Sequence, residues 1–292
     1  MSKQSVFLAG LAAGLLWSHE PQAAGLPFEI DNTNRWAWSE VAGWVNGKTT
    51  HGAAQVVYDG AQSYLSGYAW LENVGWLKLG VGAGPYANTA ADNWGVNMDG
   101  EWRLSGYAWS ETAGWINFAP THGGVAVNPN GGGFSGYAWG ENIGWIHFTN
   151  SSPAYVMQAQ IGVTSNGVPQ WWLWDYGVTN DFDAAAAADW DGDEAFTWEE
   201  YVAGTDPTDP QSVLALDVPG FKEQPALGAR LRWQSRPDRL YTLEWGSNLL
   251  AVPPFQPVLL DAPGSNGVYT FTDTNAVAPI WHLYRLRARP AP

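Results

Sequence analysis

The sequence SGYAWGENIGWIHF at residues 135–148 decides the fold of this chain, because near-copies of it occur three times upstream. Two full copies cover residues 66–77 and 105–116, and a more divergent copy covers residues 35–45. Internal repetition of this kind indicates an architecture in which each unit buries its apolar face against its neighbours. The repeats therefore set the organisation of the first half of the chain.

Turn signals divide each repeat into three short strands. A valine-rich segment precedes each full copy and ends in Asp59-Gly60, Asp99-Gly100 or the sequence at residues 128–131. Asp-Gly between apolar runs is a strong hairpin signal. We therefore expect tandem three-stranded antiparallel β-repeats, each with a valine-rich strand, an SGYAW strand and a GWI strand.

The hairpin inside the motif has a predictable register. If residues 140–144 form its loop, Trp139 and Trp145 are cross-strand neighbours, and Tyr137 lies beside His147 on the same face. The opposite face then carries small or aliphatic residues and one phenylalanine, namely Ala138, Ile146 and Phe148.

The repeat tryptophans have two interpretations. Burying a large aromatic side chain contributes about 2–3 kcal/mol, whereas ordering roughly 115 residues costs on the order of 100–200 kcal/mol. The repeats contain few Leu and Ile, so this comparison favours the tryptophans as core. The alternative is an exposed platform that stacks sugars.

A glutamate also recurs in each hairpin loop, at Glu40, Glu72, Glu111 and Glu141. Each carboxylate either accepts loop N–H bonds, which we favour, or contacts a ligand once per repeat. Under the platform alternative, the candidate ligand-binding residues are Trp70, Glu72, Trp109, Glu111, Trp139 and Glu141.

An aspartate-rich stretch, DWDGDEAFTWEE at residues 189–200, fits the twelve-position EF-hand loop. The expected Ca²⁺ ligands are the side chains of Asp189, Asp191, Asp193, Thr197 and Glu200, with the carbonyl of Ala195. Glu194 departs from the pattern, because it stands where glycine normally makes the turn. The left-handed conformation costs a non-glycine residue about 1–2 kcal/mol.

The composition around this loop supports a bound cation. Ten of the 28 Asp and Glu lie between residues 181 and 209, with no Lys or Arg among them. A divalent ion would remove their mutual repulsion, and a solvated acidic loop is the alternative. Short helices are expected at residues 169–177, 184–188 and 197–203.

A family resemblance follows from GVPQWW at residues 167–172, the loop itself, and EEYVAGTDPTDP at residues 199–210. These segments resemble a calcium-binding module, similar to thrombospondin type 3 repeats, of exported proteins in bacteria such as Verrucomicrobia and Planctomycetes. The SGYAW repeats likewise resemble tandem repeats of bacterial surface proteins. The resemblance implies export and Ca²⁺ binding.

The C-terminal part reads as β-strands with Pro and Gly turns and predicts a small β-sandwich. The order of segments resembles the fibronectin type III-like modules that follow the calcium module in such proteins. Eight of the 13 Lys and Arg lie from Lys222 onward. Docking of this part on the acidic loop is a hypothesis, and we favour an ordinary solvated surface.

Composition excludes several partners. The formal net charge is −15, and no Lys or Arg lies between Arg103 and Lys222, so nucleic acid and acidic partners are disfavoured. No cysteine is present.

Lys3 and the apolar run at residues 6–17 predict a signal peptide at residues 1–24 and a secreted or cell-surface protein. No later stretch is long and apolar enough to span a membrane.

These observations predict a mainly β fold with a repeat domain at 25–155, a calcium module at 163–212 and a β-sandwich at 213–290. The favoured function is a calcium-binding structural or adhesive protein that is not an enzyme and contacts surface polysaccharide or other envelope proteins. A lectin-like carbohydrate-binding protein is the alternative. A polysaccharide-acting enzyme is third, because the sequence shows no nucleophile elbow, histidine metal cluster or phosphate loop.

Overall fold

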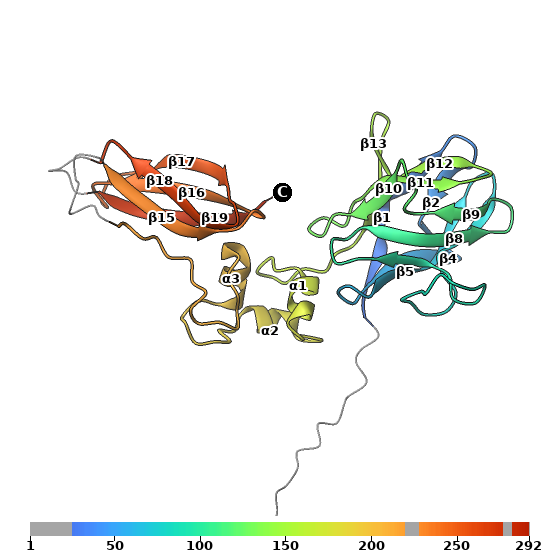
Figure 1. Cartoon of the computed structure of the whole chain (residues 1–292), viewed down its shortest axis with the longest axis horizontal. Coiled ribbons are helices and arrows are strands. Elements are labelled where there is room, and N and C mark those ends of the chain that lie inside the picture. The colour runs from blue at the N-terminus through green and yellow to red at the C-terminus, as the bar shows by residue number, and fades with distance from the viewer. Residues whose placement is uncertain (1–24, 220–227, 277–281, 292) are drawn as a thin grey trace, which may run out of the picture.

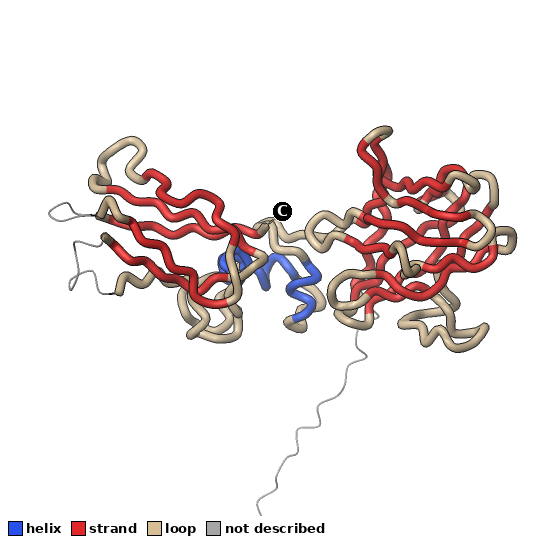
Figure 2. The backbone as a smooth tube through the Cα atoms, turned by 45° about the horizontal axis from the view of Figure 1, so that its top comes forward, coloured by secondary structure: helices blue, strands red, loops and turns tan. Residues whose placement is uncertain are grey.

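The computed structural model describes residues 25–219, 228–276 and 282–291, so the expected signal peptide lies outside the described residues. The structure is mainly β, which confirms the predicted fold class. Figure 1 shows a repeat domain and a two-sheet domain with three short helices between them. Figure 2 shows how little of the chain is helical.

Eight strands of the four repeats form a closed ring. Each SGYAW strand pairs with the GWI strand of its own repeat and with that of the preceding one. The ring closes because the last strand pairs with the first, so that the sheet has no free edge here. In order, the strands are β1 (Leu26–Ser39), β2 (Gly43–Asn46), β5 (Ser63–Leu71), β6 (Gly75–Lys78), β8 (Leu104–Ser110), β9 (Gly114–Asn117), β11 (Phe134–Gly140) and β12 (Gly144–His147).

The valine-rich strands extend the ring at the other end. β4 (Gly52–Tyr58), β7 (Val96–Met98) and β10 (Gly124–Val127) each pair with the SGYAW strand of their own repeat. In the first repeat this position is occupied by β14 (Ala154–Ala159), a strand that follows the fourth repeat in the sequence and pairs with β1. β14 runs past the expected boundary at residue 155. Two short strands, β3 (Lys48–Thr49) and β13 (Thr149–Ser151), pair with β4 and β14.

Glycine is required where the long SGYAW strands change partners. Gly106 and Gly136 both have φ of +88°. A Cβ atom would lie 2.3 Å from the Gly95 carbonyl oxygen at Gly106, and 2.0 Å from the Gly124 carbonyl oxygen at Gly136. The Ser-Gly of the motif therefore marks the point at which each strand bends from one partner to the next.

The predicted hairpin register is confirmed, since Trp139 pairs with Trp145 and Tyr137 with His147. The prediction that the repeat tryptophans form the core is wrong. Trp139 and Trp145 are 37% and 39% exposed, whereas the opposite face is buried. The closed sheet encloses a narrow space, which alanine on one strand and Val, Leu or Ile on the next can fill. The alanines are Ala37, Ala69, Ala108 and Ala138.

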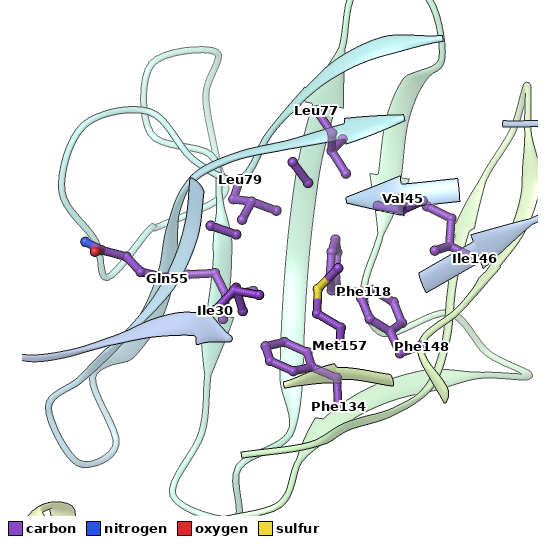
Figure 3. A pocket seen from close by; sticks show the side chains of 13 residues that line it. Ile30, Val45, Gln55, Leu77, Leu79, Phe118, Phe134, Ile146, Phe148 and Met157 are labelled. Carbon is purple, nitrogen blue, oxygen red and sulfur yellow. The ribbon is translucent and has the colours of Figure 1, made fainter. Parts of the chain in front are cut away.

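The interior of the ring is closely packed. A cavity of about 20 Å³ lies there among mostly apolar side chains, including those of Leu77, Ile146 and Phe148 (Figure 3). A cavity of this size and lining offers a water molecule no polar partners. The interior therefore serves packing, and ligands have to be sought on the outside.

Three helices connect the two β domains: α1 (Gln170–Asp175), α2 (Phe182–Ala186) and α3 (Thr197–Ala203). α1 packs on the end of the ring where the valine-rich strands turn. The Trp171 Nε1 donates to the Pro129 carbonyl oxygen at 2.9 Å, and the Tyr58 hydroxyl donates to the Asp175 carboxylate at 2.9 Å. Burial raises the pKa of Asp175, and the nearby charge of Asp59 adds to this effect.

The C-terminal domain has two sheets. β15 (Ala229–Ser235) pairs with β18 (Gly267–Asp273), and β16 (Arg239–Gly246) lies between β17 (Gln256–Pro263) and β19 (Leu283–Pro290). Trp233 is fully buried and contacts Tyr241 of the other sheet. The buried Arg239 donates to the carbonyl oxygens of Tyr201 and Val202, so this domain does dock on α3, at the end of the helix.

Candidate functional site

The outer face of the ring carries most of the exposed aromatic side chains of the repeats. Tyrosine and tryptophan of the SGYAW strand and tryptophan of the GWI strand alternate with the buried residues, as the period of a strand requires. Their rings meet edge to face within each hairpin, as with Trp70 and Trp76, whose centroids are 5.1 Å apart at 78°. The members more than a third exposed are Tyr68, Trp70, Trp76, Tyr107, Trp115, Tyr137, Trp139 and Trp145.

Three grooves run between successive repeats on this face. Groove A, of about 870 Å³, lies between the second and third repeats. Tyr68, Trp76 and Lys78 form one wall, and Trp109 and Glu111 of the next repeat form the other. Lys78 is the strand partner of Trp109, so the two walls are fixed by the sheet itself.

Groove B repeats this arrangement between the third and fourth repeats, with a volume of about 420 Å³. Tyr107, Trp115 and Asn117 face Trp139 and Glu141 across it. The long loop between β6 and β7 adds the nearly buried Trp94, which meets Trp115 edge to face at 5.1 Å, and also Asn88.

Groove C, of about 460 Å³, joins the fourth repeat to the first. Tyr137, Trp145 and His147 face Trp38 and Glu40. Tyr137 and His147 stack with centroids 4.2 Å apart, and burial lowers the pKa of His147. His122, to which the sequence assigns no role, also lines this groove.

The fourth interface, between the first and second repeats, is built differently. Trp44 is half-buried, and Tyr155 of β14 packs edge to face on it with centroids 5.3 Å apart. The Glu72 carboxylate accepts a hydrogen bond from the Trp44 backbone at 3.1 Å. The pseudo-fourfold arrangement is therefore broken near β1, where β14 packs against the first repeat.

The loop glutamates differ in the same way. In contrast to Glu72, the carboxylates of Glu40, Glu111 and Glu141 form no hydrogen bond or ion pair with any residue that the structure describes. All three are exposed at the rim of a groove. Grooves B and C thus combine aromatic faces with one carboxylate that has no partner among the described residues, whereas groove A also contains Lys78.

The structure brings together most of the ligand-binding candidates from the sequence. Trp70, Trp109 and Glu111 line groove A, and Trp139 and Glu141 line groove B, whereas the Glu72 carboxylate accepts a hydrogen bond from the Trp44 backbone. Each groove takes one wall from the next repeat and further residues from a loop. Residue spacing within a single motif carries no signal for this assembly, which is why His51, Asn88, Trp94 and His122 were missed.

The acidic loop is the second candidate site. Carboxylate oxygens of Asp189, Asp191 and Asp193 lie within 4.8 Å of one another. Backbone N–H groups hold them in place, with Gly192 and Glu194 donating to the two oxygens of Asp189 at 2.8 and 3.1 Å. Glu194 has φ of +80°, so it adopts the left-handed turn expected at this position despite its side chain.

Glu200 lies at the base of this loop, in α3. It is 1% exposed, and its Oε2 has no hydrogen-bond partner among the described residues; the same holds for Asp191 Oδ2. Burial raises the pKa of Glu200 to about 7, and the charges of Asp191, Asp193 and Asp189 contribute. Buried carboxylate oxygens without partners fit the oxygen ligands that Ca²⁺ prefers.

The two remaining expected ligands, Thr197 and Ala195, form hydrogen bonds within the protein. The Thr197 hydroxyl donates to the Ala188 carbonyl oxygen at 2.8 Å. The Ala195 N–H donates to Asp193 Oδ1 at 2.8 Å, which leaves its carbonyl oxygen for a cation. The loop is therefore built around its carboxylates, with Thr197 fastening it to the preceding segment.

No protein-family model matches the sequence, and neither a curated protein nor a solved structure matches the chain. Among the described residues, no helix has the length and apolar character needed to cross a membrane.

Proposed function

We propose that this protein is a secreted or cell-surface adhesive protein that binds carbohydrate through its outer aromatic grooves and uses Ca²⁺ as a structural ion. The single observation that carries the proposal is the set of three grooves in which exposed tryptophans converge with a free carboxylate. Exposed aromatic surface of this kind marks interaction sites, because a monomer gains nothing by leaving it in water.

Carbohydrate suits these grooves on chemical grounds. A sugar ring has an apolar face of C–H groups and a rim of hydroxyls. The tryptophan faces of groove B offer an apolar surface, and Asn88, Asn117 and Glu141 offer donors and acceptors beside it. The ligands would be surface polysaccharides, and the proposed role is binding without catalysis.

Ca²⁺ has a structural role in this proposal. Asp189, Asp191, Asp193, the Ala195 carbonyl and Glu200 would hold the ion, with Thr197 at the remaining loop position. The bound ion supplies positive charge that cancels the repulsion of these carboxylates. Since α3 also carries the carbonyl oxygens that accept from Arg239, ordering of the loop would steady the contact between the helices and the C-terminal domain.

The proposal is tested by titrating the full chain, with Ca²⁺ present, with soluble polysaccharides while tryptophan fluorescence is recorded. We expect saturable binding that Trp115→Ala and Trp145→Ala weaken. Trp190→Ala, which changes a tryptophan in the acidic loop outside all three grooves, is the control. Unchanged fluorescence and no binding across neutral, amino and acidic polysaccharides would contradict the proposed carbohydrate role.

A further inference from the structure

We infer that grooves B and C select carbohydrate units that carry a protonated amino group, over neutral and acidic sugars. This inference rests on the proposed carbohydrate function and names the substrate class of those grooves. It follows from the charge of the grooves, from the orientation of their aromatic rings, and from an ammonium group that the chain itself places on the same surface.

Each of the two grooves has one carboxylate at its rim, and no described Lys or Arg lines either of them. Glu141 lies at the rim of groove B and Glu40 at the rim of groove C, and neither carboxylate has a polar partner in the part of the chain that the structure describes. No Lys or Arg occurs between Arg103 and Lys222, and the whole chain has a net charge of −15. An acidic sugar would be repelled, whereas an ammonium group would give the carboxylate the partner it lacks.

The aromatic rings favour a cation in the same place. Trp139 and Trp145 meet at 65° with centroids 4.7 Å apart, and Tyr107 and Trp115 meet at 75°. In such a pair one ring presents its electron-rich face beside the edge of the other. A cation near the face of tryptophan is attracted by the ring quadrupole. Ring face and carboxylate therefore act on the same charge.

Lys78 gives an internal example of this contact. Its ammonium nitrogen lies 5.9 Å from the ring centroid of Trp94, a residue that lines groove B. The Lys78 side chain also lines groove A, where it brings a positive charge of its own. Groove A is left out of the inference because Lys78 lines it, whereas Lys78 lines neither groove B nor groove C.

The test compares three oligosaccharides on the full chain at saturating Ca²⁺, low salt and near-neutral pH, because acid would promote protonation of His122 and His147 in groove C. Glucosamine oligomers carry free amines, N-acetylglucosamine oligomers have the same backbone without the charge, and galacturonic acid oligomers are acidic. We expect glucosamine oligomers to bind about tenfold more tightly than the N-acetylated ones. Added salt should shrink the difference, because exposed charges are screened.

Matched variants separate this inference from the proposed function. The double variant Glu40→Gln with Glu141→Gln should lose the preference for the amine, while Glu72→Gln should keep it, because Glu72 accepts from the Trp44 backbone and lines neither groove. Equal binding of the three oligomers, or a preference that survives in the double variant, overturns only the amine selectivity. Absence of binding to all three overturns the carbohydrate function itself.

Discussion

Trp38 of β1 is the strand partner of His147 of β12, and this pairing joins the first repeat to the fourth. Paired antiparallel residues have Cα atoms about 4.5–5.5 Å apart, which is within the range a disulfide spans. The chain has no cysteine of its own, so an introduced pair reports on this contact alone.

We expect Trp38→Cys with His147→Cys to form an internal disulfide on mild oxidation. Because it closes a loop of roughly 100 residues, it should stabilise the ring by about 4 kcal/mol. Non-reducing electrophoresis and chemical unfolding measure the two effects. The pair Trp38→Cys with Trp109→Cys, on strands that are not neighbours, should remain reduced. Equal cross-linking of both pairs would contradict the closed ring.

The glycines of the motif should resist substitution according to their strand position. Gly106→Ala places a methyl group 2.3 Å from the Gly95 carbonyl oxygen at a φ of +88°, so it should lower the free energy of unfolding by at least about 2 kcal/mol. At Gly100 an added Cβ meets no atom within 4 Å, so Gly100→Ala is the control. Similar unfolding midpoints for both variants would argue against a strained bend at the motif.

A buried and an exposed tryptophan should respond differently to truncation. Trp102 is 5% exposed, and Trp102→Ala should cost about 3–5 kcal/mol of stability. Trp115 is 43% exposed, so Trp115→Ala should cost much less stability but weaken glycan binding. Calorimetry and binding titrations on both variants test this. A loss of stability in Trp115→Ala as large as that in Trp102→Ala would contradict the assignment of the repeat tryptophans to the outer face.

Ca²⁺ should stabilise the helical segment by mass action. At a free concentration 100 times the Kd, the gain is about 2.7 kcal/mol. Glu200→Gln removes a buried charge whose Oε2 has no partner among the described residues. We expect it to abolish most of the difference between Ca²⁺ and EDTA in thermal unfolding, and to make the EDTA form more stable. Thr208→Ala, outside the loop, serves as control, and equal midpoints for the original protein in Ca²⁺ and EDTA would refute the site.

The contact between α1 and the ring should depend on pH through Asp175. Burial raises its folded-state pKa above the ordinary 3.8. A carboxyl group with a raised pKa contributes stability at pH below its unfolded value, and this contribution is lost as pH rises through the folded value. Asp175→Asn should remove this loss of stability at higher pH, while its amide oxygen can still accept a hydrogen bond from the Tyr58 hydroxyl.

Tyr58→Phe provides the contrast to Asp175→Asn. It leaves the Asp175 carboxylate buried without this donor, which should cost about 1.5–3 kcal/mol near neutral pH. Chemical unfolding as a function of pH measures both variants. A pH profile of Asp175→Asn that is as steep as that of the original protein would assign the dependence to other groups.

Local patterns predicted a large part of the fold. Trp139 and Trp145 lie at equal distances from the centre of the hairpin loop, and this spacing predicted the register. Gly204 predicted the end of α3. The sequence did not predict which face of each hairpin points into the ring, because the alternation of residues distinguishes two faces but does not show which of them is buried. The alanine opposite each tryptophan was the available signal, since a narrow closed sheet admits only small side chains at such positions.

The candidate sites divide in the same way. The acidic loop is one continuous segment, so its spacing was sufficient to bring Asp189, Asp191 and Asp193 together. The grooves require residues from two repeats and a loop, as when Trp94 meets Trp115. Such contacts depend on how the repeats are arranged around the ring, which no single motif encodes.

The pairing of β14 with β1 also has a consequence for the order of assembly. The first strand of the chain lacks one neighbour until Ala159 has been synthesised, although all four copies of the motif are complete before that residue. Contacts this distant in sequence slow folding, because a long loop must close before they form. The ring itself closes when β12 pairs with β1, and because Trp38 and His147 of this pairing are far apart in the sequence, we expect closure to be a late step of folding.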